Sequence, residues 1–403
     1  MFWNTLAKRV TNGTLHLHFP DGTVHTLGSG QPEATIEFRR RGTLRRILMW
    51  PGLQLGETYM RGEWSVPRND LLPLFEIVLR NLGTGAYSPL ARAVRPVIRT
   101  ISEFNWPWRA RRNISRHYDL DARLFRKFLD RDMQYSCAYF PRPGLSLEDA
   151  QTAKREHVAR KLLLEPDAKV LDIGCGWGGM ALHLAEHYGA KVVGLTLSSE
   201  QLEVAQQRAR ERGLAERVEF RLQDYRRHRG SYDAIVSVGM FEHVGRPQYQ
   251  RFFDTVHKLL APGGTTLLHT IGRSGPPAAT NPWIRRHIFP GGYIPALSEM
   301  ARPVEKSGLV MSDLEVLRLH YAETLKHWNQ RFQATREEFS KELGEEFCRM
   351  WEFYLQISQA AFSWSDLVVL QLQLNRSNDS VPMTRDYLYG ESRHIGRSAA
   401  ISA

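Results

Sequence analysis

A glycine-rich stretch behind a short apolar segment constrains the fold more than any other feature of this sequence. Residues 170–179 read Val-Leu-Asp-Ile-Gly-Cys-Gly-Trp-Gly-Gly, and an apolar helical stretch follows at residues 181–185. Glycines let the backbone turn tightly and approach a ligand closely. A strand, a glycine loop and a helix in this order are typical of a nucleotide-binding site in an α/β fold.

Strand and helix patterns alternate from about residue 150 to residue 272. Helical stretches separate five short apolar segments, and such repeated units predict a parallel sheet with helices on both faces. Residues 315–365 are rich in aromatic residues and read as mainly helical. The predicted strands are Lys169–Ile173, Lys191–Leu195, Val218–Leu222, Ala234–Val238 and Thr265–His269.

The glycine loop by itself leaves two cofactors open, because the fragment also fits G-x-G-x-x-G. An NAD site needs an acid about 20 residues later, at the end of the second strand. Residues 192–196 contain no carboxylate there, whereas Asp172 precedes Gly174 by two residues. That arrangement is usual for methyltransferases that use S-adenosylmethionine (SAM). Asp224 follows the third strand, where this fold commonly faces the adenine. The alternative for both acids is ordinary capping of strand ends.

The remaining chain predicts further parts. Residues 1–90 predict a small α+β accessory domain with a hairpin, Thr14–Phe19 and Thr23–Leu27, a further strand at Thr35–Phe38, and helix over Leu53–Leu82. Residues 91–112 form a predicted basic linker. Residues 113–403 form the predicted catalytic domain, which is mainly helical after residue 272.

The net charge of +11 and the pI near 9.6 favour an anionic partner. Both nucleic acid and an anionic membrane surface fit such a charge, but no RNA-recognition signature is present. Tryptophans sit at lipid headgroups and arginines meet phosphates, so the linker favours a membrane surface; a solvated tether is the alternative. This basic stretch contains Arg92, Arg95, Arg99, Trp106, Trp108, Arg109, Arg111, Arg112 and Arg116, and Arg39, Arg40, Arg41, Arg45 and Arg46 would extend it.

Three further observations bear on the compartment. No apolar run approaches the roughly 20 residues of a membrane span. The N-terminal residues lack a secretory signal. The cysteines Cys137, Cys175 and Cys348 are sparse and show no metal-ligand spacing, which favours reduced thiols. We therefore expect a cytoplasmic protein, without a metal, that associates peripherally with the inner face of the cell membrane.

Several longer motifs resemble the cyclopropane-fatty-acyl-phospholipid synthase family. The family's accessory domain is matched by Leu-Gly-Glu-Thr-Tyr-Met-Arg-Gly-Glu-Trp at residues 55–64. The catalytic part is matched by residues 113–119, 133–139, 194–201, 223–226, 237–245, 268–272 and 320–321, among them Ser-Val-Gly-Met-Phe-Glu-His-Val-Gly at 237–245. The resemblance covers nearly the whole chain and implies a Rossmann-like SAM-dependent methyltransferase sheet with helical lipid-binding additions.

The resemblance also implies a substrate, a second cofactor and a set of site residues. Family members add a methylene from SAM across a cis double bond of a phospholipid acyl chain, and they use a bicarbonate ion as base. They often form dimers, so a homodimer stays open. The implied SAM contacts, together with Asp172, are Tyr135, Ser136, Gly174, Gly176, Thr196, Leu197, Gln201, Gln223, Asp224 and Val238. The implied bicarbonate contacts are Cys137, Glu242, His269, Ile271 (through its backbone) and Tyr321.

Three other functions remain open at this point. Methylation of an alkene leaves a carbocation, and a hydride shift with proton loss would give a branched chain instead of a ring. A small-molecule N- or O-methyltransferase would not need Cys137, Glu242, His269 and Tyr321. A lipid-binding protein with a vestigial cofactor fold would not need Asp172, and it would fail to bind SAM.

Overall fold

The computed structural model describes residues 3, 7–82 and 122–389, and these form two compact units. Unit 1 contains the described residues up to 82 together with residues 280–290 and 321–367. Unit 2 contains residues 122–279, 291–320 and 368–389. The predicted linker, the motif at 113–119 and the final residues lie outside the described part. The domain boundaries predicted at residues 90 and 113 also fall there and stay predictions.

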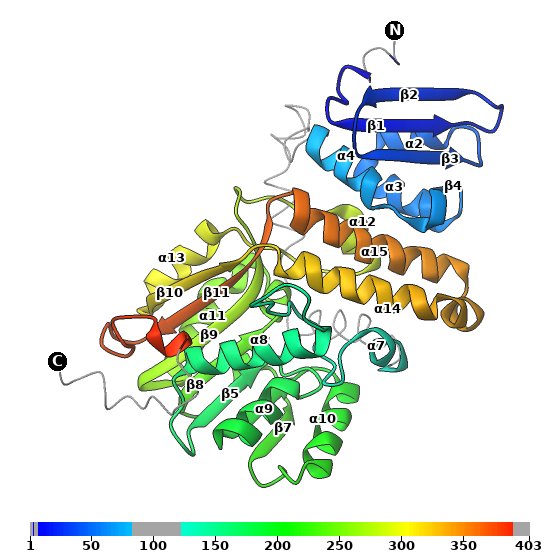
Figure 1. The fold of residues 1–403 in the computed structure, drawn as a ribbon. Coiled ribbons are helices and arrows are strands. Elements are labelled where there is room, and N and C mark those ends of the chain that lie inside the picture. Colours follow the sequence, from blue (N-terminus) through cyan, green and yellow to red (C-terminus); the bar gives the residue numbers. More distant parts are fainter. Residues whose placement is uncertain (1–2, 4–6, 83–121, 390–403) are drawn as a thin grey trace. The chain divides into compact units, whose positions relative to one another are not determined.

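Unit 2 is built on a seven-stranded sheet (Figure 1). The five strands β9, β8, β5, β6 and β7 run parallel to their neighbours, while β10 and β11 pair antiparallel at the other edge. All five predicted strands are present. In their order across the sheet the strands are β10 (Val310–Leu317), β11 (Leu367–Asn375), β9 (Leu260–Arg273), β8 (Tyr232–Val238), β5 (Lys169–Ile173), β6 (Lys191–Thr196) and β7 (Val218–Leu222).

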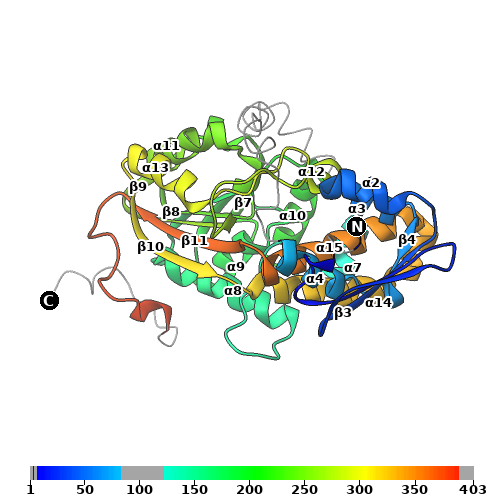
Figure 2. The same cartoon turned by 90° about the horizontal axis from the view of Figure 1, so that it is seen from above.

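Helices cover both faces of this sheet, as predicted. Figure 2 shows α11 (Tyr249–Leu259) and α13 (Leu297–Ser307) on one side and α8 (Leu147–Leu162) and α9 (Gly179–Tyr188) on the other. The helix α10 (Ser199–Glu211) shares the core of α8 and α9. Shorter elements are α7 (Ala122–Phe128), η2 (Tyr225–Arg227), η3 (Phe241–His243), η4 (Arg246–Gln248) and η5 (Asp386–Leu388).

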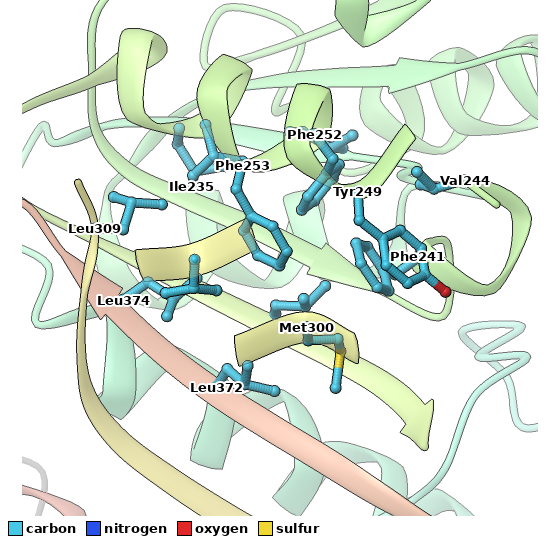
Figure 3. Close-up of a cluster of buried hydrophobic side chains, with 14 of the residues drawn as sticks. Ile235, Phe241, Val244, Tyr249, Phe252, Phe253, Met300, Leu309, Leu372 and Leu374 are labelled. Carbon is cyan, nitrogen blue, oxygen red and sulfur yellow. The ribbon is translucent and has the colours of Figure 1, made fainter. Parts of the chain in front are cut away.

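A large apolar cluster fills the space between the sheet and the helices α11 and α13. Figure 3 shows Phe253, Met300 and Leu372, from α11, α13 and β11, gathered in this cluster. Each is almost fully buried, and burial of such a side chain contributes about 1.5–3 kcal/mol. The cluster holds β8 and β9 in place, and functional residues follow or lie on both strands.

The strands β10 and β11 are absent from the sequence prediction. The strand β11 reads Leu-Val-Val-Leu-Gln-Leu-Gln-Leu-Asn, and its two glutamines are buried rather than exposed. Residues 370–375 alternate apolar and polar residues, which is typical of a strand, so the sequence did contain a signal for β11 that the prediction did not use. The helical prediction for residues 315–365 is correct from residue 320, but its first residues belong to β10.

Unit 1 combines the N-terminal residues with two later segments of the chain. Its sheet has the order β2 (Val24–Ser29), β1 (Gly13–His18), β3 (Glu33–Phe38), β4 (Trp64–Ser65), and the predicted hairpin is the antiparallel pair β1 and β2. Its helices are α2 (Thr43–Met49), α3 (Pro51–Met60), η1 (Pro67–Asn69), α4 (Leu72–Leu82), α12 (Pro282–His287), α14 (His320–Leu343) and α15 (Glu345–Trp364).

The single helical segment predicted for residues 53–82 is wrong in one respect. The chain leaves the helix after Met60 and passes through Gly62, whose φ of +68° lies in the left-handed region that favours glycine. Trp64 then pairs with Phe38 in the sheet before α4 begins. The turn therefore divides the segment into two helices.

Candidate active site

A pocket opens at the carboxyl ends of four neighbouring strands of unit 2. The loops that follow β5, β6, β7 and β8 contribute to its wall, together with residues 133–136. This edge of an open parallel sheet is where such folds bind ligands. All eleven residues predicted to contact SAM line the pocket: Tyr135, Ser136, Asp172, Gly174, Gly176, Thr196, Leu197, Gln201, Gln223, Asp224 and Val238. Their roles in binding stay predictions.

The glycine loop is anchored to the neighbouring strand. The backbone N–H groups of Gly174 and Cys175 both donate to the carbonyl oxygen of Leu195, each at 2.9 Å. Gly174 has a φ of +83°, and a Cβ placed there would lie 2.6 Å from the side chain of Met240. A side chain at this position would therefore strain the backbone and fill the space at the base of the pocket.

The polar residues beyond the second strand are held by short-range hydrogen bonds. Ser198 caps α10 by accepting from the backbone N–H of Gln201, and this places Gln201 in the wall of the pocket. The hydroxyl of Thr196 donates to Gln201 Oε1 at 3.0 Å. At this position, where NAD enzymes carry an acid, the structure has an amide that can bind a ribose hydroxyl.

Asp224 and Gln223 line the pocket but already have partners within the protein. Arg226 donates from its backbone N–H and its guanidinium to Asp224. Burial opposes ionisation of Asp224, but the hydrogen bonds from Arg226 outweigh it and lower the pKa of the carboxyl. Asp224 is therefore ionised at neutral pH. Gln223 Oε1 lies 2.9 Å from Nδ1 of His228.

Asp172 lies at the end of β5 and is almost completely buried. Its Oδ2 accepts no hydrogen bond from the described residues. Burial raises the pKa of Asp172 to about 7, although the charge of Lys154 acts in the opposite direction. Buried carboxylate oxygens normally have partners, so this atom at the wall of the pocket suits a ligand that donates a hydrogen bond.

Lys154 is a site residue that the sequence analysis missed. It is fully buried on α8, and its Nζ donates to Ser136 Oγ at 3.1 Å and to Gln134 Oε1 at 2.5 Å. Both acceptors line the pocket. Burial lowers the pKa of Lys154 to about 7, and the charge of Arg155 acts in the same direction. The sequence pattern of α8 gives no signal for this role, because a lysine on a helix is usually exposed, whereas Lys154, Arg155 and Lys161 of this helix are all buried.

The glycine loop and the segment after β8 supply pocket residues that the analysis also missed. Trp177 lies inside the loop, and Met240 and His243 follow β8. Burial lowers the pKa of His243 to about 4, so this side chain is neutral at pH 7. Trp177 and Met240 lie one and two residues, respectively, after predicted SAM contacts, and His243 directly follows a predicted catalytic residue. This proximity in sequence is the signal that could have identified them.

Glu242, in η3, directly adjoins the pocket residue His243. It is buried, and its Oε1 accepts a hydrogen bond from the backbone N–H of Ile271 at 2.6 Å. Its Oε2 is also buried and has no hydrogen-bond partner among the described residues. Burial raises the pKa of Glu242 against the opposing effect of the bond from Ile271. Glu242 therefore presents one oxygen that the protein holds and one that it leaves for another group.

His269 lies on β9, two residues before Ile271, whose backbone N–H donates to Glu242. It is the register partner of Val238, and its carbonyl oxygen accepts from the backbone N–H of Gly239 at 2.9 Å. Burial lowers the pKa of His269 well below its usual range, and the positive charges of Lys154 and Lys161 lower it further. The ring is therefore neutral and lies in a positively charged environment.

The remaining two residues of the predicted catalytic set lie in different units. Cys137 belongs to unit 2 and is fully buried. Tyr321 belongs to unit 1, where it packs against Trp328 and Phe362. The structure thus gathers Glu242, His269 and Ile271, whereas the participation of Tyr321 stays a prediction.

A parallel sheet of this strand order, a glycine loop preceded by Asp172 and a pocket at the strand ends define the SAM-dependent methyltransferases, and this protein is one of them. The chain belongs to the mycolic acid cyclopropane synthetase family, which it matches over residues 107–372. Residues 2–75 match a domain of unknown function, DUF7884.

The chain is also similar to characterised proteins over most of its length. It is 39% identical over 352 residues to the cyclopropane-fatty-acyl-phospholipid synthase of Escherichia coli (strain K12), which covers 86% of this chain and 89% of that protein. It is 36% identical over 391 residues to the tuberculostearic acid methyltransferase of Mycobacterium tuberculosis (strain ATCC 25618 / H37Rv), with coverages of 92% and 90%.

A solved structure resembles the catalytic part. The mycolic acid cyclopropane synthase CmaA1, in complex with SAH and CTAB, aligns with a TM-score of 0.62 at 33% identity and covers 66% of this chain and 97% of that one. Together these matches confirm the predicted family, the predicted fold class and the predicted use of SAM.

Proposed function

We propose that this protein is a cyclopropane synthase that adds a methylene from SAM across a cis double bond of a phospholipid acyl chain. The observation that carries the proposal is the buried Glu242, held by Ile271 beside the cofactor pocket with one oxygen left without a protein partner. The similarity to the Escherichia coli synthase supports the same substrate class.

The chemistry sets three demands on the protein. Bound SAM supplies an electrophilic methyl group. Formation of a bond between that methyl and one alkene carbon leaves a positive charge on the other carbon. A base must then remove a proton from the new methyl, and the electrons of that C–H bond close the ring. The protein must hold the acyl chain in line and exclude water, which would capture the cation.

The residues near Glu242 fit a small anion that serves as this base. The charges of Lys154 and Lys161 act on His269, so this region favours an anion. Cys137, Glu242 and His269 would hold bicarbonate, with Ile271 keeping Glu242 in position. The raised pKa of Glu242 suits a carboxyl that exchanges a proton with the anion.

The decisive experiment is an incubation of the full chain with SAM, bicarbonate and vesicles of unsaturated phospholipid, followed by analysis of the fatty acids. We expect a product that is one methylene heavier and has lost its double bond. If no modified lipid forms under these conditions, the proposal is contradicted.

Substitution of Glu242 separates its proposed role from SAM binding. In Glu242→Gln the amide oxygen can still accept from Ile271, so we expect SAM affinity within about twofold of the parent. Turnover should fall by about 10²–10⁴-fold, the range for loss of an acid–base group. Glu156→Gln, at a partly buried carboxylate elsewhere in unit 2, is the matched control and should keep turnover. A loss of SAM affinity in Glu242→Gln would assign Glu242 to the cofactor instead.

A branched-chain product is the second candidate, and the similarity to tuberculostearic acid methyltransferase favours it. The same cation, after a hydride shift and proton loss, gives a methylene-branched chain that has the mass of the ring product. A saturated methyl branch is two hydrogens heavier and needs an added reductant. Proton NMR of the product distinguishes a ring from an alkene, and a reductant requirement identifies the third outcome.

A segment of unit 1 supports binding to an anionic membrane surface. Arg39, Arg40, Arg41 and Arg45 are exposed, and the exposed fractions of Met49 and Trp50 are 56% and 70%. Arg46 instead pairs with the buried Glu63 and belongs to the fold. No helix among residues 7–82 and 122–389 is long and apolar enough to cross a membrane. Exposed arginines beside an exposed tryptophan suit a peripheral contact with lipid headgroups.

Vesicle binding tests this segment. Replacement of Arg39, Arg41 and Arg45 by glutamine should weaken binding to anionic vesicles by about 1 kcal/mol for each arginine. Trp50→Ala should weaken vesicle binding further, and added salt should also weaken it. Met383→Ala, at an exposed methionine of unit 2, is the control and should bind normally. Binding that is insensitive to salt would contradict the proposal.

A further inference from the structure

A chain of buried hydrogen bonds connects His269 to residues that the proposed chemistry does not use. Gln371 on β11 places its Nε2 3.1 Å from Nδ1 of His269 and its Oε1 2.8 Å from Nζ of Lys161 on α8. Lys161 pairs in turn with Glu315 on β10, whose Oε2 lies 2.6 Å from Nε2 of His157. Gln371 and Lys161 are completely buried and His269 almost so.

Lys161 determines which way the amide of Gln371 points. An ammonium group has three donors and no acceptor, so the atom of Gln371 that faces Lys161 must be its carbonyl oxygen. The amide nitrogen therefore faces His269 and donates to it. Burial opposes ionisation of Glu315, but the hydrogen bond from His157 and the charges of His157 and Lys161 lower its pKa to about 2. Burial lowers the pKa of Lys161, but the ionised carboxylate of Glu315 beside it opposes this shift and stabilises the ammonium form.

The orientation of Gln371 in turn determines the protonation of His269. A ring nitrogen that accepts a hydrogen bond carries no proton, and in a neutral imidazole the other nitrogen must carry it. The low pKa of His269 keeps the ring neutral. We propose that Gln371 and Lys161 lock His269 in the Nε2–H tautomer, so that His269 is a fixed hydrogen-bond donor to the bound anion and not the base that accepts the proton.

This inference deepens the proposed function and rests on it, because it takes His269 as a contact of the bound anion. The two side chains then have different roles toward the anion: His269 can donate a hydrogen bond to an anion oxygen, whereas Glu242 can accept a proton or a hydrogen bond from the anion. Gln371 is then a positioning residue that acts through His269, and Lys161 acts through Gln371. The arrangement keeps the proton acceptor at the anion and at Glu242.

The substitution Gln371→Glu tests whether Gln371 fixes the tautomer of His269, and it changes the volume of the side chain little. A carboxylate at this position accepts from Lys161 and also from a protonated Nδ1, so it should reverse the tautomer. We would measure the ring nitrogens of histidine in ¹⁵N-labelled full-length protein by NMR, with the His269 signals assigned from the spectrum of His269→Gln. The parent should show Nε2–H, and Gln371→Glu should show Nδ1–H. SAM affinity should stay within about twofold, and kcat should fall about 10- to 100-fold, as for other positioning partners.

The neighbouring glutamine of the same strand provides the control. Gln373 is equally buried, donates to the carbonyl oxygen of Lys161 and accepts from Tyr387, but has no contact with His269. Gln373→Glu should lower the melting temperature while leaving the tautomer of His269 and kcat close to those of the parent. If Gln371→Glu does not fold, Gln371→Leu serves instead, and loss of the donor should give a mixture of the two tautomers.

An Nδ1–H signal in the parent would overturn the inference, and so would an unchanged tautomer in both Gln371 variants. The NMR measurement needs no turnover, so it separates the inference from the proposed function. If the Nε2–H tautomer of the parent reverses in Gln371→Glu but no lipid product forms, the inference about His269 stands and the proposed reaction is contradicted. Ring formation by a parent with Nδ1–H would support the proposed reaction and overturn the inference about the tautomer of His269.

Discussion

The cofactor pocket of unit 2 and the interior of unit 1 are both buried, but they are assembled from very different stretches of chain. The pocket uses residues that directly follow consecutive strands, and its bonds join neighbouring loops, as between Gly174 and Leu195. In unit 1 the hydroxyl of Tyr59 donates to Glu352 at 2.5 Å across 293 residues. The backbone N–H of Leu71 donates to Gln356 across 285 residues.

This difference explains why the two regions should respond differently to substitution. The pocket depends on positive φ angles at single positions of the loop, and glycines such as Gly174 adopt them without strain. Unit 1 depends on a few polar anchors on α15, where Glu352 also accepts from the guanidinium of Arg336 at 2.9 Å. Glu352 is fully buried. Loss of a pocket residue should therefore affect the ligand first, and loss of an anchor should affect stability first.

The largest effect should come from Glu352→Ala. Removal of one partner of a buried ion pair costs about 3–5 kcal/mol, because the other charge stays buried. Tyr59 would lose its partner and Arg336 would keep only Glu345, and hydrogen exchange should show loss of protection in α3 and α15. Glu346→Ala, at an exposed position of the same helix, should change the free energy of unfolding by less than about 1 kcal/mol. A weaker affinity for SAM in Glu352→Ala would show that the two regions are coupled.

An intermediate effect is expected from Gly174→Ala. The positive φ costs about 1–3 kcal/mol in a residue with a side chain, and the new Cβ would displace Met240. SAM affinity, measured by calorimetry, should fall at least about tenfold, the equivalent of 1.4 kcal/mol. Gly189→Ala is the matched control, since Gly189 has a φ of +64° and no atom within 4 Å of an added Cβ. It should lose similar stability but bind SAM normally, and equal binding by both variants would refute the role of the loop.

The pH dependence of stability provides a third test of the pocket. The pKa of Asp172 is about 7 in the folded protein and about 3.9 in an unfolded chain. Between these values the folded state holds a proton that the unfolded state has lost, so the free energy of unfolding decreases as pH rises. The slope is up to about 1.4 kcal/mol per pH unit. In Asp172→Asn, chemical denaturation should no longer show this decrease of the free energy of unfolding between about pH 4 and pH 7.

Asp167→Asn is the control for the pH experiment. Asp167 is exposed, and the hydrogen bond from Arg217 lowers its pKa. Any stability that it contributes is present above its unfolded pKa and is lost only at more acidic pH. Its substitution should therefore leave the slope between about pH 4 and pH 7 unchanged. Parallel pH profiles for the parent and Asp172→Asn would contradict the assigned burial effect.

Sequence patterns predicted much of the pocket because its parts are contiguous. Asp172 and the glycines belong to one stretch, and the other predicted contacts follow strands that alternation had already identified. Trp177 and Met240, which also line the pocket, are their immediate neighbours. Lys154 is different, because it reaches the pocket only through the packing of α8, and a lysine on a helix is usually exposed.

Local sequence patterns were sufficient to predict the parallel sheet, the position of the cofactor loop and the family, because strand periodicity and glycine conformation are local properties that motifs record directly. The folded structure was needed to show that β10 and β11 extend the sheet, that α12, α14 and α15 join the N-terminal residues in unit 1, and that Gln371 reaches His269. These depend on long-range packing and on partners for buried polar atoms, and no local pattern in a single sequence specifies which distant residues will meet.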